Sequence, residues 1–154
     1  MASAASTGAA AAIVIRIKPR ISNFTIRPAT LVAATRGPSL LAATAGGAGA
    51  LVSYVAFDVT STTFTVQRPL AGRRRGRNCV KPTSHNRTAK RCTRYVNLGS
   101  FTRAESIALG KSRFRFTGRV AGRRLKPGHY RLQAIARNSG GTGPPAFAQF
   151  SVKR

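Results

Sequence analysis

The chain has 154 residues, enough for one domain with a tail, and it carries 27 Lys and Arg against two acidic residues, a formal net charge of +25. The two carboxylates, Asp58 and Glu105, exclude extensive ion pairing and leave little material for acid–base catalysis. The positive field favours anionic partners such as nucleic acid, cell-wall polymers or acidic glycans. No stretch approaches the ~20 apolar residues of a membrane span.

Residues 1–20 are rich in alanine and are expected to form a flexible leader or linker, because they lack the positive start and the clear cleavage site of a signal peptide. A folded domain is expected over residues 21–154. Its first strand, 21–26, should stop before Pro28, since proline has no N–H for a sheet ladder. Residues 35–50, rich in Gly and Pro, predict a long turn.

The clearest strand patterns follow. Residues 51–57 and 62–68 are rich in β-branched and aromatic residues, and the four residues 58–61 between them predict a hairpin. Thr62, Phe64 and Val66 should share one face of the second strand. Residues 69–95 then interrupt the alternation as a basic insert that contains both cysteines.

Strand character returns at 95–101, 111–117, 130–137 and 147–152, while 102–109 allows a helical turn or two. About seven short strands with turns between them predict an all-β, antiparallel β-sandwich of the immunoglobulin or fibronectin-III type. Tyr130 follows a Pro-Gly turn at the start of a late strand. This position is typical of a tyrosine corner, in which the hydroxyl bonds to backbone a few residues upstream.

The domain resembles the immunoglobulin-like, fibronectin-III-like modules of bacterial surface and secreted proteins. The resemblance lies in 52–68, in the insert 72–95, in 112–119 and in 125–141. It implies a sandwich fold and an extracellular or cell-envelope location. It implies no catalytic activity and no particular ligand.

Cys79 and Cys92 are separated by 12 residues in a segment that leaves one strand and returns to the next. A disulfide between them would stabilise the fold by roughly 3 kcal/mol in the loop-entropy model and would indicate an oxidising compartment. Zinc is the rival interpretation, but it needs four ligands, and His85 and His129 are the two nitrogen donors of the chain. Free thiols are the third possibility.

The same insert concentrates arginine, whose planar fork suits phosphate and carboxylate. If the disulfide forms, these cations decorate one protruding hairpin that can bind anions. The opposing interpretation is that arginine is simply tolerated over the whole surface, because it also occurs at outward strand positions such as Arg113 and Arg131. The candidate anion-binding residues are Arg73, Arg74, Arg75, Arg77, Lys90, Arg91 and Arg94.

The sequence offers no acid–base pair for catalysis. Asp58 is expected in a turn and Glu105 in a polar connection, and neither is expected to lie beside a second titratable group. No catalytic, cofactor or metal site is predicted. The leading hypothesis is a non-catalytic, monomeric module of the cell envelope that acts as a spacer or adhesion domain beside further domains of a larger protein. The alternative is a protein that binds anionic polymers, nucleic acid or cell-wall components, through the basic insert.

Overall fold

The computed structural model describes residues 17–154, with the backbone alone at 106–108, and shows an all-β protein. Residues 1–16, most of the expected leader, lie outside the described residues. None of the described residues forms a helix that could cross a membrane. The strands are β1 (Arg20–Arg27), β2 (Thr30–Val32), β3 (Leu40–Ala42), β4 (Ala50–Arg75), β5 (Asn78–Val80), β6 (Arg91–Phe116), β7 (Arg119–Val120), β8 (Arg123–Arg124), β9 (Gly128–Asn138), β10 (Gly141–Thr142) and β11 (Ala146–Lys153).

Two strands of 26 residues, β4 and β6, dominate the fold and overturn two expectations. The predicted hairpin at 58–61 is wrong, because β4 runs through it and pairs with β6 from Ala50↔Phe116 to Arg73↔Arg91. Residues 102–109, where the sequence allows a helical turn, belong to β6 instead. Residues 58–61 do not reverse the chain. They form an irregularity, with Asp58 at φ 53° and a register shift after Val59, and such bulges bend a strand.

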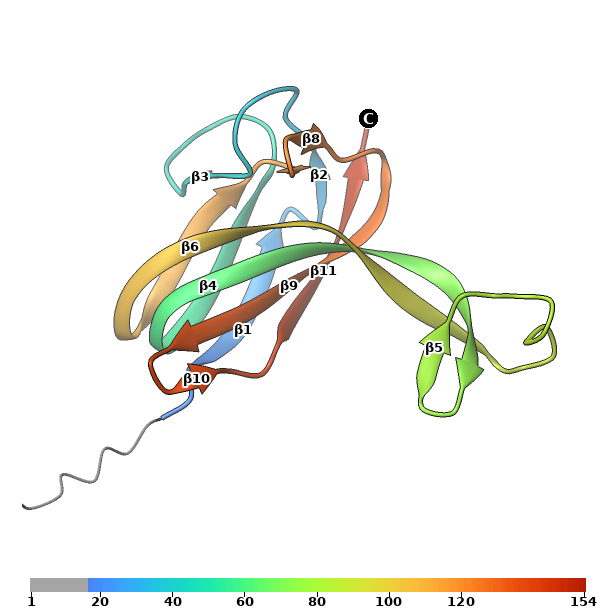
Figure 1. The fold of residues 1–154 in the computed structure, drawn as a ribbon. Helices are drawn as coiled ribbons and strands as arrows, with labels where there is room; N and C mark the ends of the chain where they lie inside the picture. Colours follow the sequence, from blue (N-terminus) through green and yellow to red (C-terminus); the bar gives the residue numbers. More distant parts are fainter. Residues whose placement is uncertain (1–16) are drawn as a thin grey trace, which may run out of the picture.

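The bend folds β4 back on itself and makes two layers from one continuous sheet (Figure 1). Ten residues of straight strand would span about 33 Å. The rings of Tyr54 and Phe64, ten residues apart in β4, have centroids 5.7 Å apart. Residues 51–57 of β4 lie between β1 and the end of β6, whereas residues 61–67 lie between β9 and the start of β6. Each long strand therefore contributes to both layers.

The strand count and direction differ from the expectation of about seven antiparallel strands. Nine strands form one sheet, with the main order β2-β11-β9-β4-β6-β3, and β7 and β8 form a separate pair. The pairing of β11 with β2 is parallel, so the sheet is mixed. Several of these strands have only two or three residues, which explains why alternation alone did not reveal them.

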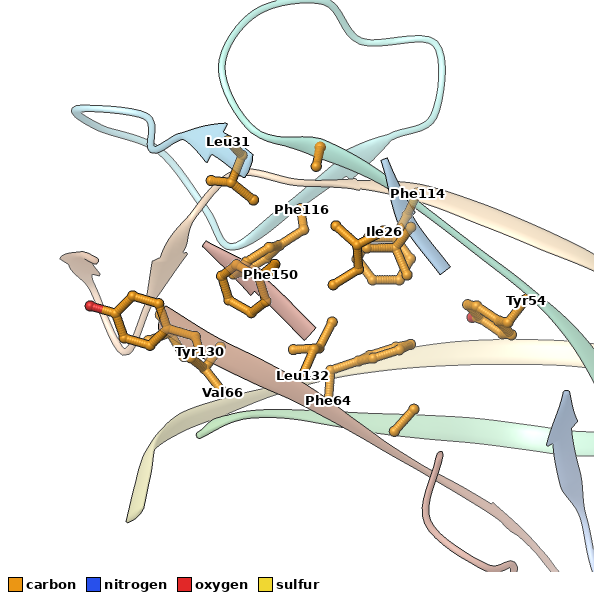
Figure 2. Close-up of a cluster of buried hydrophobic side chains, with 14 of the residues drawn as sticks. Ile26, Leu31, Tyr54, Phe64, Val66, Phe114, Phe116, Tyr130, Leu132 and Phe150 are labelled. Carbon is orange, nitrogen blue, oxygen red and sulfur yellow. The ribbon is translucent and has the colours of Figure 1, made fainter. Parts of the chain in front are cut away.

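The core lies between the two layers and consists mainly of aromatic and β-branched side chains (Figure 2). Phe64 packs edge-to-face on Phe114 with centroids 4.8 Å apart, and the rings of Phe116 and Phe150 meet at 5.5 Å. The predicted shared face of Thr62, Phe64 and Val66 is confirmed, because all three are buried. The same alternation buries every second residue of the later strands: Phe114 and Phe116; Tyr130, Leu132, Ala134 and Ala136; Phe150 and Val152.

Tyr130 stands at the start of β9, on the edge of this core. Its ring stacks on Phe150, and its hydroxyl donates a 2.5 Å hydrogen bond to the carbonyl oxygen of Lys126, four residues upstream. This is the contact expected of a tyrosine corner. Burial raises the pKa of the Tyr130 phenol above its usual value of 10.0.

Candidate anion-binding arm

Residues 69–95, here called the arm, project from the sandwich as a ribbon (Figure 1). The ribbon is made of the same strands as the body, since β4 continues to Arg75 and β6 begins at Arg91. The expected hairpin insert is therefore a continuation of the two long strands. β5 adds a third strand, paired with β4 from Arg73↔Val80 to Arg75↔Asn78, so the arm has the strand order β5-β4-β6.

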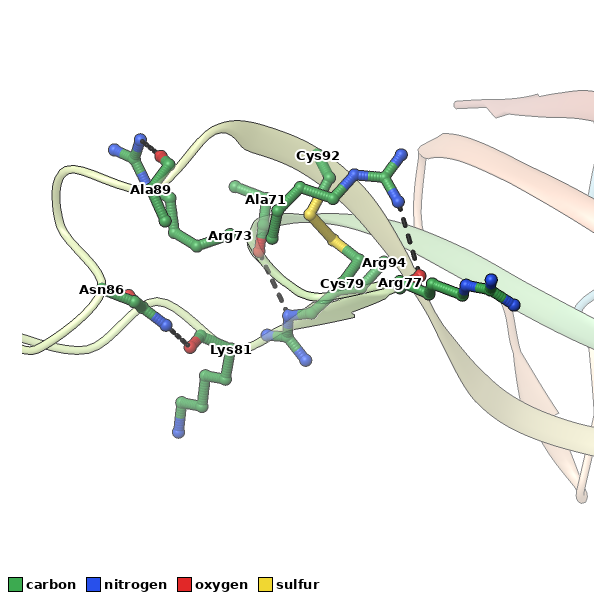
Figure 3. Close-up of a disulfide and its surroundings, with 10 residues drawn as sticks. Ala71, Arg73, Arg77, Cys79, Lys81, Asn86, Ala89, Cys92 and Arg94 are labelled. Atoms are coloured by element: carbon green, nitrogen blue, oxygen red, sulfur yellow. Dashed lines mark hydrogen bonds between the residues drawn. A yellow bond between two sulfur atoms is a disulfide. The ribbon is translucent and has the colours of Figure 1, made fainter.

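A disulfide between Cys79 and Cys92 joins the two outer strands of the arm across β4 (Figure 3). The two Cα atoms are 5.9 Å apart, within the usual range for such a bond. Cys92 stands opposite Gly72 of β4, and Cys79 stands opposite Arg74. A Cβ atom built on Gly72 would contact both sulfur atoms. The bridge therefore passes over the one position of β4 where any side chain would obstruct it.

The arm carries nine Lys and Arg residues and no carboxylate. The side chains of Arg74, Arg75, Arg77, Lys90 and Arg91 are exposed, and those of Arg73 and Arg94 are half-buried. The hydrogen bonds of the arm's arginines go to backbone: Arg73 donates to Ala89 O at 2.9 Å, and Arg94 donates to Ala71 O at 3.1 Å (Figure 3). The positive charge is therefore held in place without being neutralised. All seven predicted anion-binding residues lie on this ribbon.

The register of the arm places cations directly opposite one another. Arg73 of β4 faces Arg91 of β6, and side chains at such positions have Cβ atoms about 5 Å apart. Like charges in this position destabilise a ribbon. Any anion that binds beside this pair would reduce the repulsion between the two charges.

The loop at the end of the arm holds His85 but no metal site. Asn86 organises the loop by donating to Lys81 O at 3.0 Å and by accepting from Thr83 N at 2.8 Å. Both cysteines are in the disulfide, and no group of three or more His, Cys, Asp or Glu that could hold a metal occurs among the described side chains. The zinc interpretation has no ligand set in residues 17–154.

Glu105 overturns the expectation that neither acid is paired. Its side chain is 1% exposed and lies 3.1 Å from the guanidinium of Arg103, which is 28% exposed. It is the acceptor of a cluster: Thr62 donates to it at 2.7 Å, Ser112 at 3.2 Å, and Tyr54 also donates to it. The donors come from both halves of β4 and from β6, so Glu105 ties the layers together near the bend. Sequence reasoning missed it because, apart from Arg103, its partners are 7 to 51 residues away in the chain.

The cluster contains a single carboxylate, that of Glu105, and four side chains donate hydrogen bonds to its two oxygen atoms. Asp58, the second acid, is exposed and accepts from Asn138 Nδ2 at 3.2 Å. A general acid–base pair needs a second titratable group within reach of the first. The described contacts of Glu105 include no histidine or second carboxylate, and they suit a structural role.

The cluster predicts a pH dependence of stability. Burial first, and then the hydrogen bond to the Glu105 carboxylate, raise the pKa of Tyr54 from 10.0 to about 12. Because the unfolded chain releases this proton at about pH 10, the contribution is full below that pH and is lost as the pH rises towards 12. Two units correspond to about 2.7 kcal/mol. Tyr54→Phe should remove this component.

Urea unfolding of wild type and Tyr54→Phe at about pH 9 and about pH 12 measures the component. The free energy of unfolding of wild type should fall by about 2 kcal/mol more than that of the variant. Equal losses in both proteins would show that Tyr54 does not hold its proton in the folded state.

No protein-family model matches the sequence, and no curated protein matches it. Among solved structures, Pseudomonas fluorescens alkylpurine DNA glycosylase AlkC bound to DNA containing an abasic site analog aligns with 89% of this chain at 12% identity, with a TM-score of 0.35. The alignment spans 31% of the glycosylase chain, so this chain corresponds to less than a third of that protein's length.

Proposed function

We propose that this chain is a non-catalytic β-sandwich module that works outside the cytoplasm and binds anionic polymers through the arm. One observation carries the proposal. Nine cations lie on a disulfide-braced ribbon that projects from the body and contains no carboxylate. Such a field attracts polyanions, and arginine forks bind phosphate or carboxylate in bidentate fashion.

The chemistry of the arm favours repeated anionic groups over nucleobases as its ligand. Residues 70–94 contain no Phe, Tyr or Trp. Proteins that read single-stranded nucleic acids stack bases on aromatic side chains. The one aromatic residue of the arm, Tyr95 at its root, already stacks on the guanidinium of Arg131. A phosphate- or carboxylate-bearing polymer of the cell envelope therefore suits the arm best, with nucleic acid as the alternative.

The immunoglobulin-like assignment is supported by strand neighbours. In the immunoglobulin fold, strands A, B and E share one sheet and C, F and G share the other. Here β1, the first half of β4 and the second half of β6 are neighbours, as are the second half of β4, β9 and β11. The Tyr130 contact at the start of β9 has the place of the tyrosine corner in strand F. β3 departs from the pattern, because it precedes β4 in the chain.

The location outside the cytoplasm is supported by the disulfide, since such bonds persist in oxidising compartments. In a larger envelope protein, the sandwich would serve as the rigid spacer that presents the arm beside neighbouring domains. The spacer role needs the fold alone, whereas the binding role needs the cations of the arm. The two roles are therefore separable by substitution.

The test is a salt titration of binding to teichoic acid and to duplex DNA. Replacing Arg73, Arg74, Arg75 and Arg77 by serine should weaken polymer binding at low salt at least about tenfold. It should also make the slope of log affinity against log salt concentration shallower by about 3. Each phosphate contact that the variant loses removes the counterion release which that contact contributed.

The matched control removes the same number of charges elsewhere, at exposed positions of the body: Arg27, Arg36, Arg113 and Arg123. This variant should bind more strongly than the arm variant. Equal weakening in both would mean that net charge alone drives binding. Unchanged affinity in the arm variant would exclude the arm as the site, and no binding by wild type at low salt would leave only the spacer role.

A further inference from the structure

A second cationic feature lies at the root of the arm, on the outer face of the layer that contains β11, β9, β4 and β6. Gln149, Arg131, Gln67 and Asn97 are aligned across these four strands in register. Arg131 Nε donates to Gln67 Oε1 at 2.6 Å, and Gln67 Nε2 donates to Asn97 Oδ1 at 2.8 Å. The hydrogen bonds run in one direction across the sheet and orient the guanidinium.

Two aromatic rings contact the same guanidinium. Its central carbon lies 3.3 Å from the centroid of the Tyr95 ring and 4.1 Å from that of Phe147. Tyr95 comes from β6 and Phe147 from β11, so the rings reach Arg131 from strands on either side of β9 and β4. Phe147 is 43% exposed, which is unusual for a ring of this size.

The Tyr95 and Phe147 rings and the Gln67 side chain, here called the clamp, leave the Nη atoms of Arg131 free for a ligand. Its two Nη atoms have no hydrogen-bond partner among the described residues, and the one ion pair found there belongs to Arg103 and Glu105. Stacking and the Gln67 bond have already removed much of the side-chain freedom that binding would otherwise cost. A fixed guanidinium with free Nη donors is suited to a bidentate oxyanion.

A pocket of about 240 Å³ adjoins this guanidinium at the root of the arm. It is lined by Arg131, Tyr95, His129, Gln149, Ser151 and Thr30, among others, so charged, amide and hydroxyl groups converge in it. His129 Nδ1 is already paired with Ser151 Oγ at 2.9 Å, which leaves Nε2 for a ligand. The volume is below that of drug-sized sites and suits a unit as small as one sugar.

We propose that this pocket binds a single acidic sugar unit, with Arg131 holding its carboxylate or phosphate group and Gln149 and His129 its hydroxyl groups. The inference rests on the anionic ligand class of the proposed function but not on the cations of the arm. The arm binds by charge density, whereas the Arg131 pocket recognises one group by geometry. Together they would select a polymer that carries acid groups on sugars.

The test is a titration of ¹⁵N-labelled protein with glucuronate, glucose 1-phosphate and glucose, followed by NMR. Glucuronate, glucose 1-phosphate or both should shift the Arg131 Nε–H and Gln149 signals saturably, and the two acids identify which oxyanion is preferred. Neutral glucose should cause no saturable shift. Absence of saturable shifts with both acids would overturn the proposal.

Variants separate binding from a purely structural brace. Arg131→Lys keeps the charge but loses the fork, and affinity should fall about tenfold. Gln149→Glu alters an exposed side chain that faces Arg131 across the strands, and its carboxylate should compete with the ligand to a similar degree. The matched control is Arg137→Lys, on the same face of β9, where Nη1 donates to Thr63 at 2.8 Å.

Arg137→Lys should bind as wild type does, and so should the variant with four arm arginines replaced. Wild-type affinity in both Arg131→Lys and Gln149→Glu would show that the clamp is a brace and no binding site. Loss of sugar-acid binding in the arm variant would place the site on the arm. Polymer binding through the arm can fail while sugar-acid binding persists, so the two proposals are tested apart.

Discussion

Glu105→Ala should lower the free energy of unfolding by about 3 kcal/mol, because it leaves four donors without their acceptor. The side chain is 1% exposed, and it accepts from Tyr54, Thr62, Arg103 and Ser112. The guanidinium of Arg103 would remain partly buried without a counter-charge. Its 28% exposure allows water to compensate in part, which keeps the expected loss at the lower end for a broken buried pair.

Urea unfolding near neutral pH measures this loss, and two variants control it. Glu105→Gln keeps the shape and one carbonyl acceptor, so it should cost less than the alanine variant. Asp58→Asn removes the other acid at an exposed position with positive φ, which asparagine tolerates, and should change stability by less than about 0.5 kcal/mol. A loss below about 1 kcal/mol in Glu105→Ala would contradict the structural role of the cluster.

Gly72→Ala should prevent or distort the Cys79–Cys92 bridge, because the new Cβ atom would contact both sulfur atoms. Loss of the bridge would cost roughly 3 kcal/mol in the loop-entropy model and would loosen the arm. Thiol titration of denatured, unreduced protein reports the outcome directly. Wild type should show no free thiol, whereas a substantial fraction of the variant should show two.

Gly76→Ala is the matched control within the arm. Gly76 has φ 61°, so alanine there costs about 1 kcal/mol of backbone strain, but nothing lies within 4 Å of the added Cβ atom. This variant should keep the disulfide. A fully formed bridge in Gly72→Ala, with wild-type stability, would mean that the strands of the arm separate easily and that Gly72 is not required.

The two halves of β4 show what the alternation of apolar and polar residues can predict and what it cannot. The inward residues 62, 64 and 66 could be predicted because a strand exposes every second side chain to the core. The prediction at 58–61 was wrong because a four-residue segment with three polar residues between two strand patterns suits a hairpin and a bulge equally. The choice between them depends on β1, β6 and β9, which pair with both sides of the bend.

The basic arm and its cysteines were apparent from local composition, whereas the Glu105 cluster and the Arg131 clamp were not. Arg131 lies 36 residues from Tyr95 in the chain, and the register of four strands brings it to that ring. Arg131 and Arg113 look alike as outward arginines in alternating strands. Their neighbours across the sheet distinguish them.

The sequence by itself therefore determined the all-β class, the inward faces of the main strands and the concentration of charge around Cys79 and Cys92. These features follow from periodicity and composition, which act over a few residues. The tertiary structure alone decided that β4 and β6 bend through both layers, that Glu105 is buried and that Arg131 is clamped. Each of these depends on strand register, which sets neighbours tens of residues apart and which no local pattern encodes.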